Sequence, residues 1–358
     1  MHEVLKTSRS GASECGVAIL MVILMIAIGL TILVALGDST YIAMRLNSAA
    51  ERRVKAEYIL KSAVNVAAVL IENDKNSQED PLTDDWMKFQ QGLEAPGAML
   101  GIDEPNVRVS LLIASEQGKI PLLQLKDTGA QGNPSTNVQK WAPVLLRLMK
   151  NLGVGNSTAD GPPVVPEQLV ANLVDYLDTN KDAFSYQSPS GESFQGTENT
   201  LSEEEELRNE GKIESVASEL SAVPGFTPDV IQKILPYVSI SNFAAVNINA
   251  APEQVLMALD ASMTQQLAAQ IIQQREQQPF TTGLVSELTA IVGGSIAGNL
   301  TSASGSGGNK VTHSGNIFEV IAKVDYGNAA FMASATLNKS GGRAGGGGGP
   351  KIESLLIY

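Results

Sequence analysis

The chain has 358 residues, 43% hydrophobic and 18% charged, a composition typical of a globular protein. Its net charge is −13, which argues against a nucleic-acid surface, because such a surface needs clustered Lys and Arg to replace counterions. The single cysteine, Cys15, excludes an internal disulfide, and two histidines without a Cys/His cluster disfavour a zinc site or a histidine-dependent active site.

The first predicted element is an uncharged apolar helix from Val17 to Gly37, behind a short leader that carries Lys6 and Arg9. At about 1.5 Å per residue this helix rises roughly 31 Å, enough to cross the hydrocarbon core of a membrane. It is too long for the core of a secretory signal, and no small-x-small cleavage site follows it. The leader favours a cytoplasmic N terminus, although arginines between residues 45 and 53 weaken the charge bias. These features alone fit a plain signal anchor equally well.

The helical pattern continues beyond the apolar run. The segment from Tyr41 to Asp74 contains neither Pro nor Gly, and apolar residues recur at helical spacing between Ile59 and Leu70. The sequence therefore predicts one long helix that runs from the bilayer into a soluble domain, where its apolar stripe lies against a sheet.

A cationic leader that ends in Gly16, followed by a long apolar helix with an amphipathic continuation, resembles a type IV prepilin. The resemblance implies that the prepilin peptidase cuts between Gly16 and Val17, that Val17 is N-methylated, and that the apolar helix survives as the assembly element. Most pilins carry Glu in the fifth place after the cut, where it neutralises the N-terminal ammonium of a neighbouring subunit. Met21 holds that place here and offers no charge. Among pilin relatives this absence resembles the minor pseudopilin K of the type II (general) secretion pathway.

Three further segments resemble the protein K family. Asn76–Phe89 is similar to its acidic segment with a Trp, and the phrase LVDYLD, Leu173–Asp178, is similar to its "LVDWLD". The strongest match is Val246–Phe280, which resembles "NVNTAP…EVL…AL…II…R…PF". The segment Val107–Leu125 matches only in part, because Pro121 and Leu122 stand where the family has Asn. The resemblance covers most of residues 1–338.

Turn residues and periodicity predict the remaining elements. Val107–Leu125 reads as two strands joined by a turn at Glu116–Gly118, and Asn316–Asn338 reads as a hairpin around Gly327–Asn328. Helices are expected within Trp141–Val154, Val165–Asn180, Ser218–Val238 and Val246–Phe280, a flexible connection over Thr301–Lys310, and a last strand or docking tail at Lys351–Tyr358.

The order of these elements predicts an α+β, pilin-like fold: a long N-terminal transmembrane helix packed on an antiparallel sheet, with a large inserted α-helical domain containing helix-hairpin-helix-like (SAM-like) repeats. The expected domains are the leader 1–16, the transmembrane and assembly helix 17–37, the first part of the pilin-like domain 38–126, the inserted domain 127–300, the last strands 301–338, and a Gly-rich segment and tail 339–358.

The loop after LVDYLD is a candidate calcium site. Asp178, Asn180 and Asp182 alternate as oxygen ligands do at the start of an EF-hand loop, but Ala183 and Pro189 break the rest of that pattern. Members of the protein K family bind Ca²⁺ in this region, so the resemblance implies Asp178, Asn180 and Asp182 as ligands, with Asp175 and Glu192 as further candidates. A solvated polar loop remains the alternative.

The helical pairs also resemble DNA-binding helix-hairpin-helix modules, which hold a phosphate on a Gly-rich hairpin. The hairpin at Asp260–Ser262 has no glycine, and the Pro224–Gly225 turn is flanked by Glu219 and Asp229 instead of lysines. The helical pairs therefore have the shape of a DNA-binding module but lack the basic, Gly-rich turns that would bind a phosphate.

The sequence contains no nucleophile–base signature, P-loop or GxGxxG motif, so no enzymatic activity is expected. The predicted function is that of a minor pseudopilin that caps the tip of the type II secretion pseudopilus and helps to initiate its assembly. The expected partners are the I- and J-type minor pseudopilins, the major pseudopilin and the prepilin peptidase, and no nucleic acid. The expected location is the bacterial inner membrane, with a single pass and a periplasmic C-terminal domain. A minor pilin of a type IV pilus and a membrane-tethered DNA receptor remain alternatives.

Overall fold

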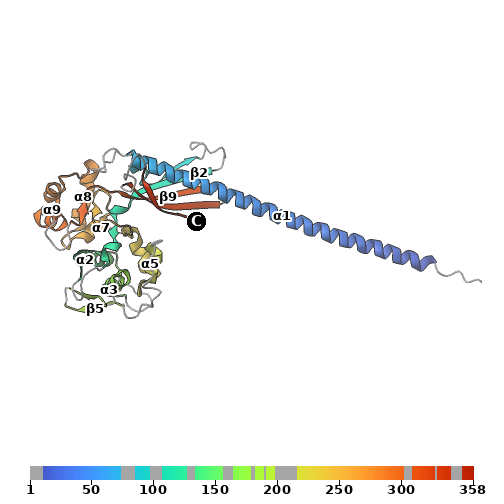
Figure 1. Cartoon of the computed structure of the whole chain (residues 1–358), viewed down its shortest axis with the longest axis horizontal. Helices are drawn as coiled ribbons and strands as arrows, with labels where there is room; N and C mark the ends of the chain where they lie inside the picture. Colours follow the sequence, from blue (N-terminus) through green and yellow to red (C-terminus); the bar gives the residue numbers. More distant parts are fainter. Residues whose placement is uncertain are drawn as a thin grey trace, which may run out of the picture. The chain divides into compact units, whose positions relative to one another are not determined.

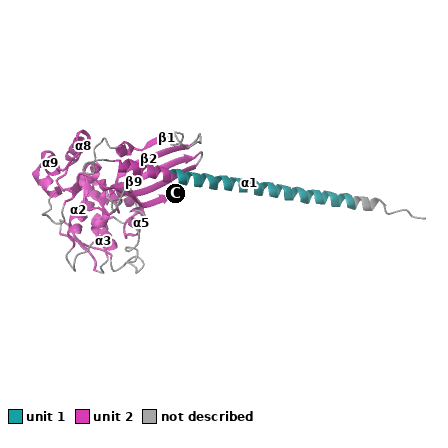
Figure 2. Cartoon of the chain, turned by 45° about the horizontal axis from the view of Figure 1, so that its top comes forward, with its two compact units in different colours: residues 1–59 teal, residues 60–358 magenta. Residues whose placement is uncertain are grey.

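The computed structural model describes residues 11–73, 85–96, 107–126, 134–155, 164–178, 182–188, 191–197, 216–301, 309–326, 329–339 and 349–358. The chain divides into two compact units, residues 1–59 and 60–358 (Figure 2). Helix α1, Gly11–Glu72, is continuous through both the apolar run and the amphipathic segment, as predicted (Figure 1).

The second unit contains a five-stranded antiparallel sheet with the strand order β1-β2-β9-β10-β11. The strands are β1 Leu93–Pro96, β2 Val107–Ser115, β9 Ile317–Tyr326, β10 Ala329–Asn338 and β11 Lys351–Ile357. The two strands of the predicted hairpin are present, since β9 and β10 pair directly from Tyr326–Ala329 to Ile317–Asn338. Its predicted turn, Gly327–Asn328, lies outside the described residues. The last segment of the chain is a strand, paired with β10.

One face of this sheet is apolar and buried. Alternate residues of the three central strands point to it: Val109, Leu111 and Ile113 of β2; Val320, Ala322 and Val324 of β9; Ala333, Ala335 and Leu337 of β10. The end of α1 has a matching buried stripe at helical spacing, formed by Leu60, Ala63, Val64, Ala67 and Ile71. Both views draw this part of the helix along the sheet (Figures 1 and 2).

The strand pairing of β2 and β9 joins segments about two hundred residues apart in the chain, with Ile113 opposite Val320. Between them lies a region rich in helices. Its longer helices are α2 Thr136–Asn151, α3 Pro166–Leu177, α8 Gln265–Gln277 and α9 Leu284–Thr301. Its shorter ones are α5 Val216–Ala222, α6 Pro228–Ile234 and α7 Glu253–Leu259.

Of the two strands predicted in Val107–Leu125, the first is confirmed and the second is wrong. After β2 come a 3₁₀ turn, η3 Glu116–Gly118, a two-residue strand, β3 Ile120–Pro121, and a second 3₁₀ turn, η4 Leu122–Leu125. Pro121 lacks the N–H that a longer ladder requires. Leu122 and Leu125 are buried three residues apart, which suits a 3₁₀ turn and not an alternating strand. Strand β3 pairs in parallel with β6, Val238–Ser239, and not with β2.

The two predicted helical hairpins are present as pairs of helices. Helices α5 and α6 flank the Pro224–Gly225 turn, where Gly225 adopts a φ of 92°, and α7 and α8 flank the turn after Asp260. Hydroxyl caps start the second helix of each pair, Thr227 on α6 and Thr264 on α8. This arrangement does not establish helix-hairpin-helix repeats, which stay a prediction.

Two further short pairings complete the described part of the helical region. Strand β7, Val246–Asn247, pairs in parallel with β8, Val311–Thr312, and β4, Ser185–Gln187, forms a hairpin with β5, Ser193–Gln195.

A 3₁₀ turn at Asp85–Phe89, η1, places the fully buried Trp86 edge-on against Phe318 of β9, with ring centroids 4.9 Å apart. The Trp of the acidic segment therefore packs on the sheet.

Candidate assembly site

The apolar half of α1 exposes its side chains. Every large hydrophobic residue between Val17 and Leu36 is more than half exposed, and Met21 is 59% exposed. The most apolar window of the helix has a mean hydropathy of 3.1, and among the described residues this helix alone is long and apolar enough to cross a membrane. Such a surface is stable only against lipid or against other apolar helices.

Gly16, Val17 and Met21 all lie within α1. Residues 1–10, with Lys6 and Arg9, fall outside the described part of the chain. Met21 lies on the exposed apolar surface of α1. In most pilins a Glu stands at this place, and its carboxylate is available to a neighbouring subunit. Cleavage after Gly16 and methylation of Val17 stay predictions.

The calcium candidates divide into three groups. Asp175 and Asp178 are 1% and 3% exposed and lie at the end of α3. Asp182 and Glu192 are exposed and belong to the segment that carries the β4–β5 hairpin, and Asn180 lies outside the described residues. One carboxylate oxygen of Asp175 accepts a hydrogen bond from the backbone N–H of Phe184 at 2.7 Å.

The contacts of Asp175 position the hairpin segment. A Cβ on Gly196 would lie 1.9 Å from Oδ2 of Asp175, so only glycine permits this approach. No group of three or more His, Cys, Asp or Glu in the described part of the chain is placed to hold a metal ion. The described residues alone therefore do not fit a calcium site, and calcium binding stays a prediction.

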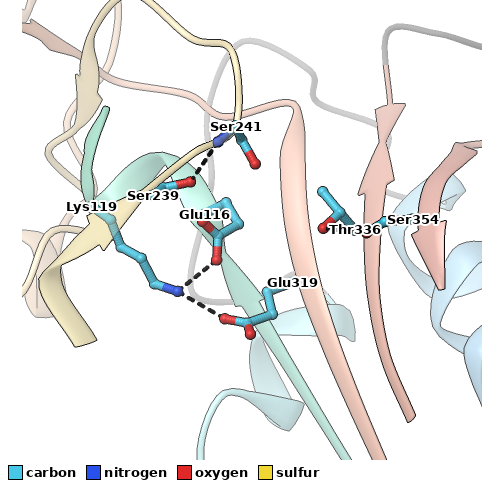
Figure 3. Close-up of polar contacts among 7 residues, drawn as sticks. All are labelled: Glu116, Lys119, Ser239, Ser241, Glu319, Thr336 and Ser354. Carbon is cyan, nitrogen blue, oxygen red and sulfur yellow. Dashed lines mark hydrogen bonds and ion pairs between the residues drawn. The ribbon is translucent and has the colours of Figure 1, made fainter. Parts of the chain in front are cut away.

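A buried ion cluster lies where the sheet meets the helical region (Figure 3). Nζ of Lys119 is 2.5 Å from Oε1 of Glu116, in η3, and 2.8 Å from Oε2 of Glu319, in β9. The side chains of these three residues are 9–27% exposed. The hydroxyl of Ser239, in β6, bonds to Glu116 and accepts a hydrogen bond from the N–H of Ser241 at 3.0 Å. The cluster thus connects η3 and β9 to β6.

The three groups of this ion cluster have displaced pKa values. Burial raises the pKa of Glu116, and Lys119 only partly offsets that effect. Burial acts to lower the pKa of Lys119, but the two carboxylates raise it above its usual value. For Glu319, burial acts to raise the pKa, and the charge and hydrogen bond of Lys119 outweigh it, so that its pKa is lowered. Between mildly acidic and mildly basic pH, Lys119 and Glu319 are therefore ionised together.

Sequence reasoning did not single out this ion cluster. The available signal was Glu319 in the run IFEVIA, whose other residues are apolar, because a charge in such a strand requires a partner. The identity of that partner is decided by the pairing of β2 with β9.

The segment Val246–Phe280 is built around Asn249, which is 6% exposed. Its Nδ2 donates to the carbonyls of Phe280 at 2.9 Å and His313 at 2.7 Å, and its Oδ1 accepts from the N–H of Phe280 at 2.9 Å. Arg275 donates to the carbonyls of Ile248 and Ala251 at 2.8 and 2.7 Å. Burial lowers the pKa of Arg275 to about 10. The Asn, Arg and Phe of this motif therefore hold together the loop before α7, helix α8 with the residues that follow it, and the residue after β8.

Two other basic side chains of the helical region also bind backbone carbonyls. Nε of Arg147 donates to Ala258 at 2.7 Å, and Nζ of Lys310 donates to Leu259 at 3.1 Å. Both carbonyls belong to the last turn of α7, where cations are favourable. These positive charges stabilise a helix end of the fold itself.

Comparisons with known proteins agree with this architecture. Two family models described as type II secretion system (T2SS), protein K, match residues 118–242 and 246–302, together about half of the chain. The structure is similar to a chain in the crystal structure of the GspK-GspI-GspJ complex from the type 2 secretion system of enterotoxigenic Escherichia coli. The TM-score is 0.58 at 14% identity, over 87% of this chain and 99% of that chain, which supports the fold. No curated protein sequence matches the chain.

The long apolar helix and the antiparallel sheet with its helical region define a protein of the pilin-like class. The chain belongs to the protein K family of the type II secretion system, a family of minor pseudopilins.

Proposed function

We propose that this minor pseudopilin caps the tip of the periplasmic pseudopilus and helps to initiate its assembly. The observation that carries the proposal is Met21, which lies on the exposed apolar surface of α1 in the fifth place after Gly16. A neighbouring subunit placed above this one would bring its N-terminal ammonium into an apolar bundle without a charge partner. An unpaired charge in such a place is costly, so addition above this subunit is disfavoured.

The helical region between β2 and β9 supports the same role through its size. It spans most of the residues from Leu122 to Thr312, far more than a hairpin that would connect two antiparallel neighbours. A domain of this bulk would obstruct a further subunit at the same end of the filament.

Through α1, the chain would associate with the I- and J-type minor pseudopilins and then with the major pseudopilin. Association with the first two is supported by the similar chain, which was crystallised in a complex with GspI and GspJ. The prepilin peptidase would act first, after Gly16. The domain beyond Gly37 would face the periplasm, with a structural and not an enzymatic role.

The test is the substitution Met21→Glu, with Met25→Glu as the matched control. Both methionines are exposed on the same apolar helix, 59% and 73%, so both substitutions place one carboxylate in the anchor. Charge at the centre of such a helix costs about 3 kcal/mol, and this cost is common to both variants. Only Glu at position 21 restores the partner of an N-terminal ammonium.

We expect Met21→Glu, and not Met25→Glu, to lengthen pseudopili in electron micrographs and to reduce secretion of a reporter protein. Unchanged pilus length and secretion in Met21→Glu, with normal membrane levels, would overturn the role of the missing charge. The family assignment disfavours the type IV pilus and DNA-receptor alternatives, which predict no effect on secretion.

A further inference from the structure

The two edge strands of the five-stranded sheet differ in how well they are protected against pairing with a further strand. Strand β1 has only four residues, ends in Pro96, and carries an ion pair to β2 between Glu94 and Arg108 at 3.3 Å. Short length, charge and proline are the features by which natural sheets block the addition of further strands. Strand β11 has seven residues, contains no proline, and carries a Leu-Leu-Ile run.

Strand β11 is weakly packed although the strand beside it is not. Residues 351–354 are exposed and residues 355–357 are half-buried, so no side chain of β11 is buried. On β10, by contrast, Ala333, Ala335 and Leu337 are fully buried. The ladder between the two strands also shifts register between Thr336 and Leu337. For elements with few buried apolar contacts, the free energy of local opening is a small fraction of the free energy of global unfolding.

Release of β11 would leave the rest of the sheet paired, because β11 pairs only with β10 within the described strands.

We propose that β11 is a releasable edge strand, and that a strand of a neighbouring pseudopilin subunit takes its place on β10 during assembly. The occupant must be antiparallel to β10 and must carry aliphatic residues at alternate positions, because Leu355 and Ile357 now lie opposite Ala335 and Ala333. Main-chain hydrogen bonds give such strand addition its affinity, and the alternate side chains give its specificity. The neighbouring subunit as occupant rests on the proposed function, whereas the release of β11 does not.

A disulfide lock tests the release. The hydroxyl of Ser354 donates to Oγ1 of Thr336 at 3.0 Å, and the two residues are direct cross-strand partners. The substitutions Thr336→Cys and Ser354→Cys, in a Cys15→Ala background, would therefore form a disulfide after oxidation. The matched control is Ser185→Cys with Ser193→Cys, another cross-strand hydroxyl pair in contact at 2.7 Å, in the β4–β5 hairpin.

The probe is a fluorescent synthetic peptide with the sequence of residues 350–358, added to the full chain in detergent and followed by anisotropy. We expect the reduced lock variant and the oxidised control to take up the peptide, and the oxidised lock variant to bind it at least 10-fold more weakly. Absence of uptake by the reduced protein would overturn the release. Equal uptake by the locked protein would also overturn it, because the peptide would then be adding to the outer edge of β11.

Secretion by cells that carry the lock variant tests the occupant. A secretion defect that added reductant reverses, and that the hairpin control lacks, is expected. If the peptide exchanges but the locked protein supports normal secretion, the neighbouring subunit does not use the β10 edge, and the proposed tip function is left intact.

Discussion

The side-chain amide of Asn249 makes two hydrogen bonds with the backbone of Phe280, one donated and one accepted, as the backbone of a paired strand residue does. It donates to the carbonyl at 2.9 Å and accepts from the N–H at 2.9 Å, across 31 residues of sequence. A second hydrogen bond of the same amide reaches His313 at 2.7 Å. One buried amide therefore fixes the end of α8 against the loop before α7 and the segment after β8.

Replacement of Asn249 should destabilise the helical region strongly. Asn249→Ala leaves two carbonyls and one N–H buried without this partner, and each such group costs about 1–3 kcal/mol. We expect a loss of about 3 kcal/mol in the free energy of unfolding, measured by urea denaturation. Gln139→Ala is the control, because the exposed amide of Gln139 makes one hydrogen bond, to Pro134 at 2.9 Å. A similar loss in both variants would contradict this role of Asn249.

Removal of the cation from the ion cluster should also destabilise the fold. Lys119→Met leaves Glu116 and Glu319 facing each other in a mostly buried site. Unpairing a buried charge costs about 3–5 kcal/mol, and partial exposure of Lys119 and Glu319 reduces this to about 2–3 kcal/mol. Lys88→Met is the matched control, since Lys88 also pairs with a carboxylate three residues before it, Asp85, but both side chains are more than half exposed. Little change is expected there, and equal losses in urea denaturation would contradict the prediction.

The two carboxylates of the ion cluster should respond to pH with opposite signs. The pKa of Glu319 is lowered in the fold, so its contribution to stability is present above its unfolded pKa, near 4.5, and is lost as the pH falls through its folded pKa. The pKa of Glu116 is raised, so its contribution is present below that unfolded value and is lost as the pH rises through its folded pKa.

The measurement compares unfolding free energies of the wild type with those of Glu319→Gln and Glu116→Gln over the acidic range. As the pH falls, the advantage of the wild type over Glu319→Gln should shrink, and its advantage over Glu116→Gln should grow. Parallel trends for the two variants would show that the pKa directions are wrong.

Processing at the N terminus is tested by mass spectrometry of the protein from membranes. The mature chain should begin at Val17 with one additional methyl group, because the leader of a prepilin is removed and its new N terminus is methylated. Gly16→Leu should retain residues 1–16, whereas Gly11→Ala, a change in the same leader, should be processed normally. An unprocessed wild-type chain would remove the basis of the assignment of α1 as an assembly helix.

Calcium binding is tested by thermal unfolding with and without Ca²⁺. A ligand at 100 times its Kd stabilises the folded state by about 2.7 kcal/mol, so a clear rise in Tm is expected. The double variant Asp178→Asn with Asp182→Asn should abolish the rise, whereas Asp229→Asn, on α6, should retain it. An unchanged Tm in the wild type would reject the site.

The sequence by itself determined the elements whose signal is local. The apolar run of α1, the stripe from Leu60 to Ile71, and the β9–β10 hairpin all follow from periodicity and turn residues that lie close together in the chain. The position of Met21 relative to Gly16 is likewise a matter of spacing alone.

Only the tertiary structure decided the relationships between distant segments. Three such relationships are the pairing of β2 with β9, the ion pair of Lys119 with Glu319, and the parallel pairing of β3 with β6. Each joins residues more than one hundred positions apart in the chain. Local propensity carries no information on such partners, because hydrogen bonds and charges in a sheet are satisfied by whichever strand the packing of the whole chain brings alongside.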